Sequence, residues 1–194
     1  MRLILGSASP RRKEILGYFS LPFEQIPSDF PEETIAFEGN PKEYATILSQ
    51  KKGESLRDKF PDSLIVTADT IVYANGRVYN KPRDRQEAFQ FLTELSGSWH
   101  DIYTAVTMTK GNTSYSDIEN TKVLFHTLTP QQISAYHDQF TYLDKAGGFA
   151  VEGSGNIILK RIEGCYYNIL GLPMNPLRSL FLKMGIDLWN HLKS

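Results

Sequence analysis

The sequence lacks the features that mark secreted and membrane-spanning proteins. It holds one cysteine, Cys165, in 194 residues, so no disulfide can form within the chain, and a single thiol is typical of a reducing compartment. No stretch approaches the ~18 apolar residues that a membrane span needs. The N-terminus also lacks the charged region and apolar core of a signal peptide. We therefore expect a cytoplasmic protein with no membrane partner.

Neither sign of charge is in excess. The chain has 21 Lys and Arg against 22 Asp and Glu, which gives a net charge of −1. A protein that mainly grips nucleic acid shows a strong basic excess, so we expect no nucleic-acid partner and only local cationic sites. The length and the hydrophobic share of 41% suit a single domain over residues 1–194.

Familiar catalytic signatures are missing as well. The sequence contains no GxxxxGK[ST] phosphate loop, no GxSxG elbow and no GxGxxG fingerprint after a strand. The histidines show no metal-ligand spacing such as HxxxH, so we assign them no role. Cys165 has no CxxC partner and fits a small buried hydrophobe. A functional site must be built from other residues.

The order of apolar and polar segments predicts a mixed α/β domain with an extended sheet. A short strand precedes Gly6, and Asn75-Gly76 indicates a hairpin. The later strand-like runs cover residues 64–73, 102–109, 122–128 and 156–162. Helices are expected over residues 10–16, 41–60, 84–97, from Thr129-Pro130 onward, and from about Asn175 to the C-terminus.

Residues 4–16 indicate an anion site. A short apolar run predicts a strand, Ser9 is a good N-cap, and Pro10 suits the first helical position. The basic residues 11–13 then fall in the first turn, where the helix dipole makes each cost on the order of 0.3–1 kcal/mol. A bound phosphate would remove the conflict. The alternative is an exposed basic turn that pairs with surface carboxylates.

Two charged residues interrupt apolar patterns. Lys52 lies on an otherwise apolar line of residues spaced by four from Tyr44 to Phe60. It either snorkels to water or projects its ammonium into a cleft. Asp69 follows Ile, Val and Ala, and a carboxylate there is costly unless it is paired or binds a cation. At a strand end it is a candidate metal ligand or general base, or it terminates the strand and caps a turn.

An acidic loop over residues 28–41 contains Glu32 and Glu33. Such loops usually only face water. Beside a phosphate site they become candidates for holding a divalent cation, because Mg²⁺ favours one or two carboxylates together with phosphate oxygens. Lys81, in the turn Asn80-Lys81-Pro82, is by itself a solvated lysine.

Five motifs occur in a set order along the chain. They are Ser7-Ala8-Ser9-Pro10-Arg11-Arg12, Ala68-Asp69-Thr70, Asn80-Lys81-Pro82, Asp144-Lys145-Ala146-Gly147-Gly148-Phe149 and Gly171-Leu172-Pro173. Together they resemble the Maf family of nucleotide pyrophosphatases, over residues 3 to about 184. The resemblance implies an elongated α/β fold of two lobes around a cleft, with a mixed sheet and flanking helices. It also implies a relation to the inosine triphosphate pyrophosphatases and a homodimer.

The same resemblance implies an activity and its residues. Maf-like enzymes cleave a nucleoside triphosphate between the α- and β-phosphates with a divalent metal (Mg²⁺, Mn²⁺ or Co²⁺), and release a monophosphate and pyrophosphate. The resemblance implies phosphate binding by Ser9, Arg12, Lys52 and Lys81, catalysis by Asp69, and metal binding by Glu33 together with Asp69.

Three further positions bear on the choice of base. Relatives that resemble the dTTP/UTP branch carry Arg, Thr and Gln at these positions, and this chain has Arg11 and Thr70 but Glu152. A glutamate there is typical of the branch that acts on 7-methyl-GTP, and a carboxylate only accepts hydrogen bonds whereas an amide also donates. We expect a pyrimidine triphosphate, either dTTP and UTP or a modified pyrimidine nucleotide. Three alternatives stay open: a substrate of the 7-methyl-GTP type or another modified nucleotide, a nucleotide-sensing regulator of cell division without turnover, and a phosphosugar or nucleotide transferase.

Overall fold

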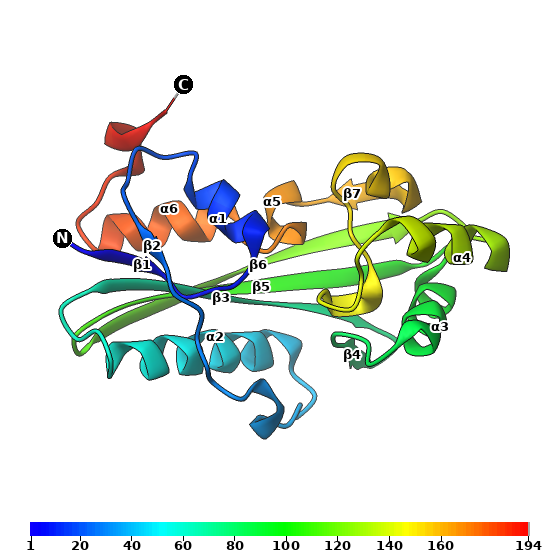
Figure 1. Cartoon of the computed structure of the whole chain (residues 1–194), viewed down its shortest axis with the longest axis horizontal. Helices are drawn as coiled ribbons and strands as arrows, with labels where there is room; N and C mark the ends of the chain where they lie inside the picture. Colours follow the sequence, from blue (N-terminus) through cyan, green and yellow to red (C-terminus); the bar gives the residue numbers. More distant parts are fainter. Residues whose placement is uncertain (194) are drawn as a thin grey trace.

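Three long antiparallel strands form the centre of the molecule (Figure 1). The computed structural model describes residues 1–193, and these form a seven-stranded mixed sheet of order β2-β1-β3-β5-β6-β7, with β4 pairing β3. Among the strands of this described part, the parallel pairs are those of β1 with β2 and of β1 with β3. The strands are β1 (Leu3–Leu5), β2 (Glu24–Gln25), β3 (Leu64–Ala74), β4 (Arg77–Tyr79), β5 (Trp99–Lys110), β6 (Thr113–Phe125) and β7 (Leu159–Glu163).

The helices gather in two groups along the sheet. At one end α1 and α6 cover one face and α2 covers the other, while α3 and α4 lie at the far end (Figure 1). The α-helices are α1 (Pro10–Leu16), α2 (Pro41–Arg57), α3 (Arg85–Leu95), α4 (Pro130–Gln139), α5 (Tyr166–Ile169) and α6 (Met174–Lys183). This arrangement confirms the expected α/β fold with two lobes. Within residues 1–193, no helix combines the length and apolarity needed to cross a bilayer.

The predicted helix starts are confirmed where a side chain caps them. The hydroxyl of Ser9 accepts from the N–H of Arg12, with Pro10 in the first turn. Asp84 caps α3 in the same way, and Thr129 forms a capping box at α4. Each cap satisfies a backbone donor that has no partner inside its helix.

Other boundaries differ from the prediction. The last helix ends at Lys183 rather than at the C-terminus, since Gly185 has a left-handed φ of +79° and a short 3₁₀ turn, Leu188–His191, follows. The final strand begins at Leu159, because Gly153–Ile158 forms another 3₁₀ segment. The strand predicted over residues 122–128 is the end of the much longer β6. Its first half is polar, and alternation alone does not reveal it.

A close approach of α2 to the sheet brings Lys52 into the interior. At Gly53 an added Cβ would lie 3.1 Å from the hydroxyl of Thr109 and 3.3 Å from that of Thr67. The absence of a side chain therefore lets the helix pack tightly against β3 and β5. Lys52, the neighbouring residue in the chain, consequently reaches β3.

Candidate active site

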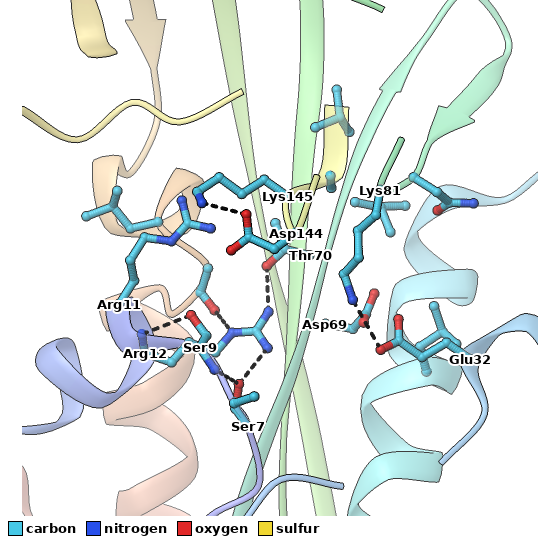
Figure 2. Close-up of a pocket in the computed structure, with 18 of the residues that line it drawn as sticks. Ser7, Ser9, Arg11, Arg12, Glu32, Asp69, Thr70, Lys81, Asp144 and Lys145 are labelled. Carbon is cyan, nitrogen blue, oxygen red and sulfur yellow. Dashed lines mark hydrogen bonds and ion pairs between the residues drawn. The ribbon is translucent and has the colours of Figure 1, made fainter. Parts of the chain in front are cut away.

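A pocket of about 790 Å³ opens between the two lobes. The loop after β1, α2, β3 and the loop that follows α4 all contribute to its walls (Figure 2). The structure brings together every site residue predicted from the sequence, since the lining includes Ser9, Arg11, Arg12, Glu33, Lys52, Asp69, Thr70, Lys81 and Glu152. It adds three charged residues outside that set, namely Glu32, Asp144 and Lys145.

Asp69 lies in the middle of β3, and not at a strand end as expected. Its strand neighbour on one side is Ala105 of β5, so the ladder continues past it. On the other side β1 stops at Leu5, which pairs with Val66, and the chain turns away at Gly6. Asp69 therefore lies just beyond the end of a parallel neighbour, where crevices form in α/β sheets.

Lys52 points into the pocket and does not snorkel to the surface. Its ammonium is 2.5 Å from Oδ1 of Asp69 and 3.1 Å from Oε1 of Glu32. The side chains of Lys52 and Asp69 are only 10% and 7% exposed. Lys81 approaches the same oxygen of Glu32 at 3.7 Å (Figure 2). Acidic and basic groups thus alternate along one wall.

Glu32, and not Glu33, is the acidic residue that faces these lysines. Both lie in a short 3₁₀ turn, Glu32–Thr34, which directs the first side chain inward and leaves the second exposed. Burial would raise the pKa of Glu32, but the positive charges of Lys52 and Lys81 outweigh it and lower that pKa. Glu33 lines the pocket and forms no ion pair with any residue in 1–193.

Arg12 is held by protein oxygens. Its Nη1 donates to the carbonyl of Ala68 at 2.8 Å and to the hydroxyl of Ser7 at 3.2 Å. Its Nε and Nη2 donate to Gly171 and Thr70. Burial lowers the pKa of Arg12, and the charge of Asp69 opposes that shift. Arg12 is therefore no exposed basic turn residue.

Two further ion pairs lie at the other side of the pocket. Arg11 Nη1 is 3.1 Å from Oε1 of Glu152. Figure 2 shows the second pair, in which Lys145 Nζ is 2.8 Å from Oδ1 of Asp144. Burial would raise the pKa of Asp144, but the charges of Lys145 and Arg11 lower it. The other oxygen of Glu152, Oε2, is buried without a hydrogen-bond partner among the described residues.

Lys145 is a pocket residue that its sequence context did not single out, although it lies within one of the five motifs. Its side chain is 12% exposed and lines the pocket. Burial of a lysine next to a candidate site is the signal that would have identified it, and sequence spacing alone does not report burial.

The charges that line the pocket cancel. The cationic lining residues are Arg11, Arg12, Lys52, Lys81 and Lys145, and the anionic ones are Glu32, Glu33, Asp69, Asp144 and Glu152. A polyanion bound here must therefore break existing ion pairs or bring a cation with it. The carboxylates of Asp69 and Glu32, on either side of Lys52, offer the hard oxygen donors that Mg²⁺ prefers. Within residues 1–193, no group of three or more His, Cys, Asp or Glu side chains is arranged to hold a metal ion.

A family comparison matches this chain to Maf-like proteins over residues 2–184. The chain belongs to the Maf-like family. The resemblance carried by the five ordered motifs is thereby confirmed.

Curated relatives of this Maf-like chain are similar along almost its whole length. A dTTP/UTP pyrophosphatase of Chlamydia trachomatis is 41% identical over 192 residues, which is 98% of each chain. A dTTP/UTP pyrophosphatase of Clostridium perfringens is 40% identical and covers 91% of this chain and 94% of its own. Among solved structures, the Ham1 protein of Staphylococcus aureus covers 64% of this chain and 72% of its own, with a TM-score of 0.46 and 10% identity.

Proposed function

We propose that this Maf-like chain is a nucleoside triphosphate pyrophosphatase that hydrolyses dTTP or UTP to the monophosphate and pyrophosphate. Relatives of that name are about 40% identical over nearly the full length. The observation that carries the proposal is the buried contact between Asp69 and Lys52, which is 2.5 Å long and lies at the pocket wall. A carboxylate among phosphate-binding cations has no use in binding alone, whereas hydrolysis needs a group that orients water.

In the proposed reaction, Asp69 orients a water and accepts its proton while the water oxygen attacks the α-phosphorus. The bond from that phosphorus to the oxygen bridging to the β-phosphate breaks, and pyrophosphate leaves. Lys81 and Lys52, together with Arg12 and the hydroxyl of Ser9, neutralise and position the phosphates. When bound, a divalent cation (Mg²⁺, Mn²⁺ or Co²⁺) would be held by Asp69 with an acid of the 32–34 turn and would supply further charge neutralisation.

Glu32 is our preferred second metal ligand, because it approaches Lys52 and Lys81, whereas Glu33, which also lines the pocket, is exposed and pairs with neither lysine. The cation is needed on charge grounds as well. A triphosphate carries several negative charges, and the charged residues of the pocket lining cancel.

We assign the base to the side of the pocket where Arg11 pairs with Glu152. A role of Thr70 in the choice of base stays a prediction, since its hydroxyl accepts from Arg12. The carboxylate of Glu152 favours a second candidate substrate of the 7-methyl-GTP type, because this residue lines the pocket and a carboxylate accepts hydrogen bonds from the N–H donors of a guanine edge. The homodimer, the cytoplasmic location and the lack of nucleic-acid or membrane partners stay predictions.

The test is a pyrophosphate-release assay with canonical and modified nucleoside triphosphates and each of the three metals. We expect turnover of dTTP and UTP, and loss of turnover in Asp69→Asn with an unchanged circular dichroism spectrum. Asp58→Asn is the matched control, since that carboxylate pairs with Arg57 on the surface. Near-normal turnover by Asp69→Asn would show that Asp69 is not the catalytic residue. Nucleotide binding without turnover by the unmodified protein would favour the sensor.

A further inference from the structure

Arg12 belongs to a closed ring of hydrogen bonds. Its Nη2 donates to the hydroxyl of Thr70 over 3.0 Å, and the hydroxyls of Thr70 and Thr104 lie 2.9 Å apart. The hydroxyl of Thr104 and the N–H of Gly171 both lie 3.0 Å from the carbonyl oxygen of Asn168. The carbonyl of Gly171 accepts from Arg12 Nε over 2.7 Å, which closes the ring.

The donor and the acceptor of every hydrogen bond in the ring are determined. A carbonyl oxygen cannot donate, so the hydroxyl of Thr104 must donate its single hydrogen to the carbonyl oxygen of Asn168. Thr70 must therefore donate to Thr104, and it accepts from Arg12. Every hydrogen in the ring has a fixed place, and none can rotate away without leaving a donor or acceptor of the ring unpaired.

The ring leaves the guanidinium of Arg12 with one uncommitted hydrogen. A guanidinium has five N–H groups, and the acceptors are Gly171 for Nε, Ser7 and Ala68 for Nη1, and Thr70 for Nη2. The second hydrogen on Nη2 has no acceptor among residues 1–193. Because the group is planar, the contacts on all three nitrogens fix the direction of that last N–H.

The distant members of the ring lie outside the pocket. Thr104 and Asn168 are fully buried and are not part of the pocket lining. The side-chain amide of Asn168 donates to the carbonyl of Ile102 over 2.8 Å, which anchors this loop to β5. Gly171 has a φ of +94°, and a Cβ there would lie 3.1 Å from Thr70 Oγ1, so the close contact requires glycine.

We propose that Thr104 is a positioning residue for nucleotide hydrolysis, acting through Thr70 to aim the uncommitted N–H of Arg12 at the substrate phosphate. The proposal rests on the pyrophosphatase function proposed above. An N–H held in place before the reaction stabilises charge that develops in the transition state without first having to reorient. Loss of the Thr104 hydroxyl should therefore affect the rate more than the binding of substrate.

Thr104→Val removes the hydroxyl and keeps the shape, and Thr104→Ser restores it. Thr121→Val is a matched control, because Thr121 is equally buried and its hydroxyl bonds the carbonyl and N–H of Cys165, both at 3.0 Å, without contacting Arg12. We expect kcat of Thr104→Val to fall about 10- to 100-fold for dTTP and UTP alike, with KM changed less than about threefold. Thr104→Ser and Thr121→Val should keep kcat within about threefold of the unmodified protein.

Three results would overturn the proposal: full kcat in Thr104→Val, equal losses in Thr104→Val and Thr121→Val, or no rescue by Thr104→Ser. If the unmodified protein releases no pyrophosphate with any of the nucleotides, the proposed function itself fails, and the positioning role that rests on it is overturned with it.

Discussion

Lys52 and Asp69 form the most deeply buried ion pair among the described residues, with 2.5 Å between Nζ and Oδ1. The two residues come from α2 and β3, so the contact joins a helix to the centre of the sheet. Removing charges from water is costly, and such a pair is tolerated only when both partners are present. The pair therefore links the stability of the fold to the proposed chemistry.

Removal of Lys52 should destabilise the protein and create a demand for a cation. Lys52→Met leaves the carboxylate of Asp69 buried without its counter-charge, which should lower the free energy of unfolding by roughly 3–5 kcal/mol in urea titrations. Added Mg²⁺ should raise the melting temperature of this variant more than that of the unmodified protein, because the ion can take the place of the ammonium beside Asp69 and Glu32.

The control for this experiment is Lys51→Met, the adjacent lysine. Its pair with Glu54 is about half exposed on both sides, and such pairs contribute ~0–1 kcal/mol. If Mg²⁺ stabilises Lys52→Met and Lys51→Met equally, these carboxylates do not hold the ion.

The two acids of the 32–34 turn should differ in their effect on metal dependence. Glu32→Gln keeps the size of the side chain but removes a charge that faces Lys52 at 3.1 Å. We expect the Mg²⁺ concentration for half-maximal pyrophosphate release to rise by about tenfold or more. Glu33→Gln, at the exposed neighbouring position, should change it less than about twofold. A larger rise of this Mg²⁺ concentration in Glu33→Gln than in Glu32→Gln would identify Glu33 as the metal ligand.

The sequence predicted the parts of this site that depend on local patterns. Ser9 precedes a proline and a helix, and the structure confirms its cap. Lys52 and Asp69 each interrupt an apolar pattern, which marked them as residues needing partners. Their contact with each other was not predicted, since periodicity assigns a residue to a face and does not measure how close two elements pack.

Local sequence patterns do not identify Glu32 or Thr104. The choice between Glu32 and Glu33 depends on the direction in which a single 3₁₀ turn faces, and composition does not encode it. Thr104 resembles any other threonine of a strand. Its importance comes from Asn168, 64 residues away in the chain, and only the folded structure brings the two together.

The charge at residue 152 should tune the choice of base. Glu152→Gln replaces an acceptor oxygen with an amide nitrogen that donates, and it removes the ion pair with Arg11. We expect the ratio of kcat/KM for dTTP to that for 7-methyl-GTP to rise by about tenfold. Glu163→Gln serves as the control, since its pair with Arg161 lies on the surface. An unchanged ratio in Glu152→Gln would remove residue 152 from base recognition.

His100 should make the stability of the fold sensitive to acid. Its ring lies edge-on to Phe125 with 4.4 Å between ring centres, and neither ring nitrogen has a hydrogen-bond partner among residues 1–193. Burial lowers the pKa of His100 from 6.5 to about 4. Between those two values the unfolded chain takes up a proton that the folded protein does not, so stability is lost as the pH falls.

The size of the loss follows from the shift and amounts to roughly 3 kcal/mol by pH 4. His100→Phe removes the titrating group, so urea titrations between pH 7 and pH 4 should show a shallower decline in its free energy of unfolding. His126→Gln is the control, because His126 is exposed and its replacement should leave the slope unchanged. Parallel declines in His100→Phe and the unmodified protein would show that other groups cause the acid sensitivity. That result would mean that the pKa of His100 is not lowered in the folded protein.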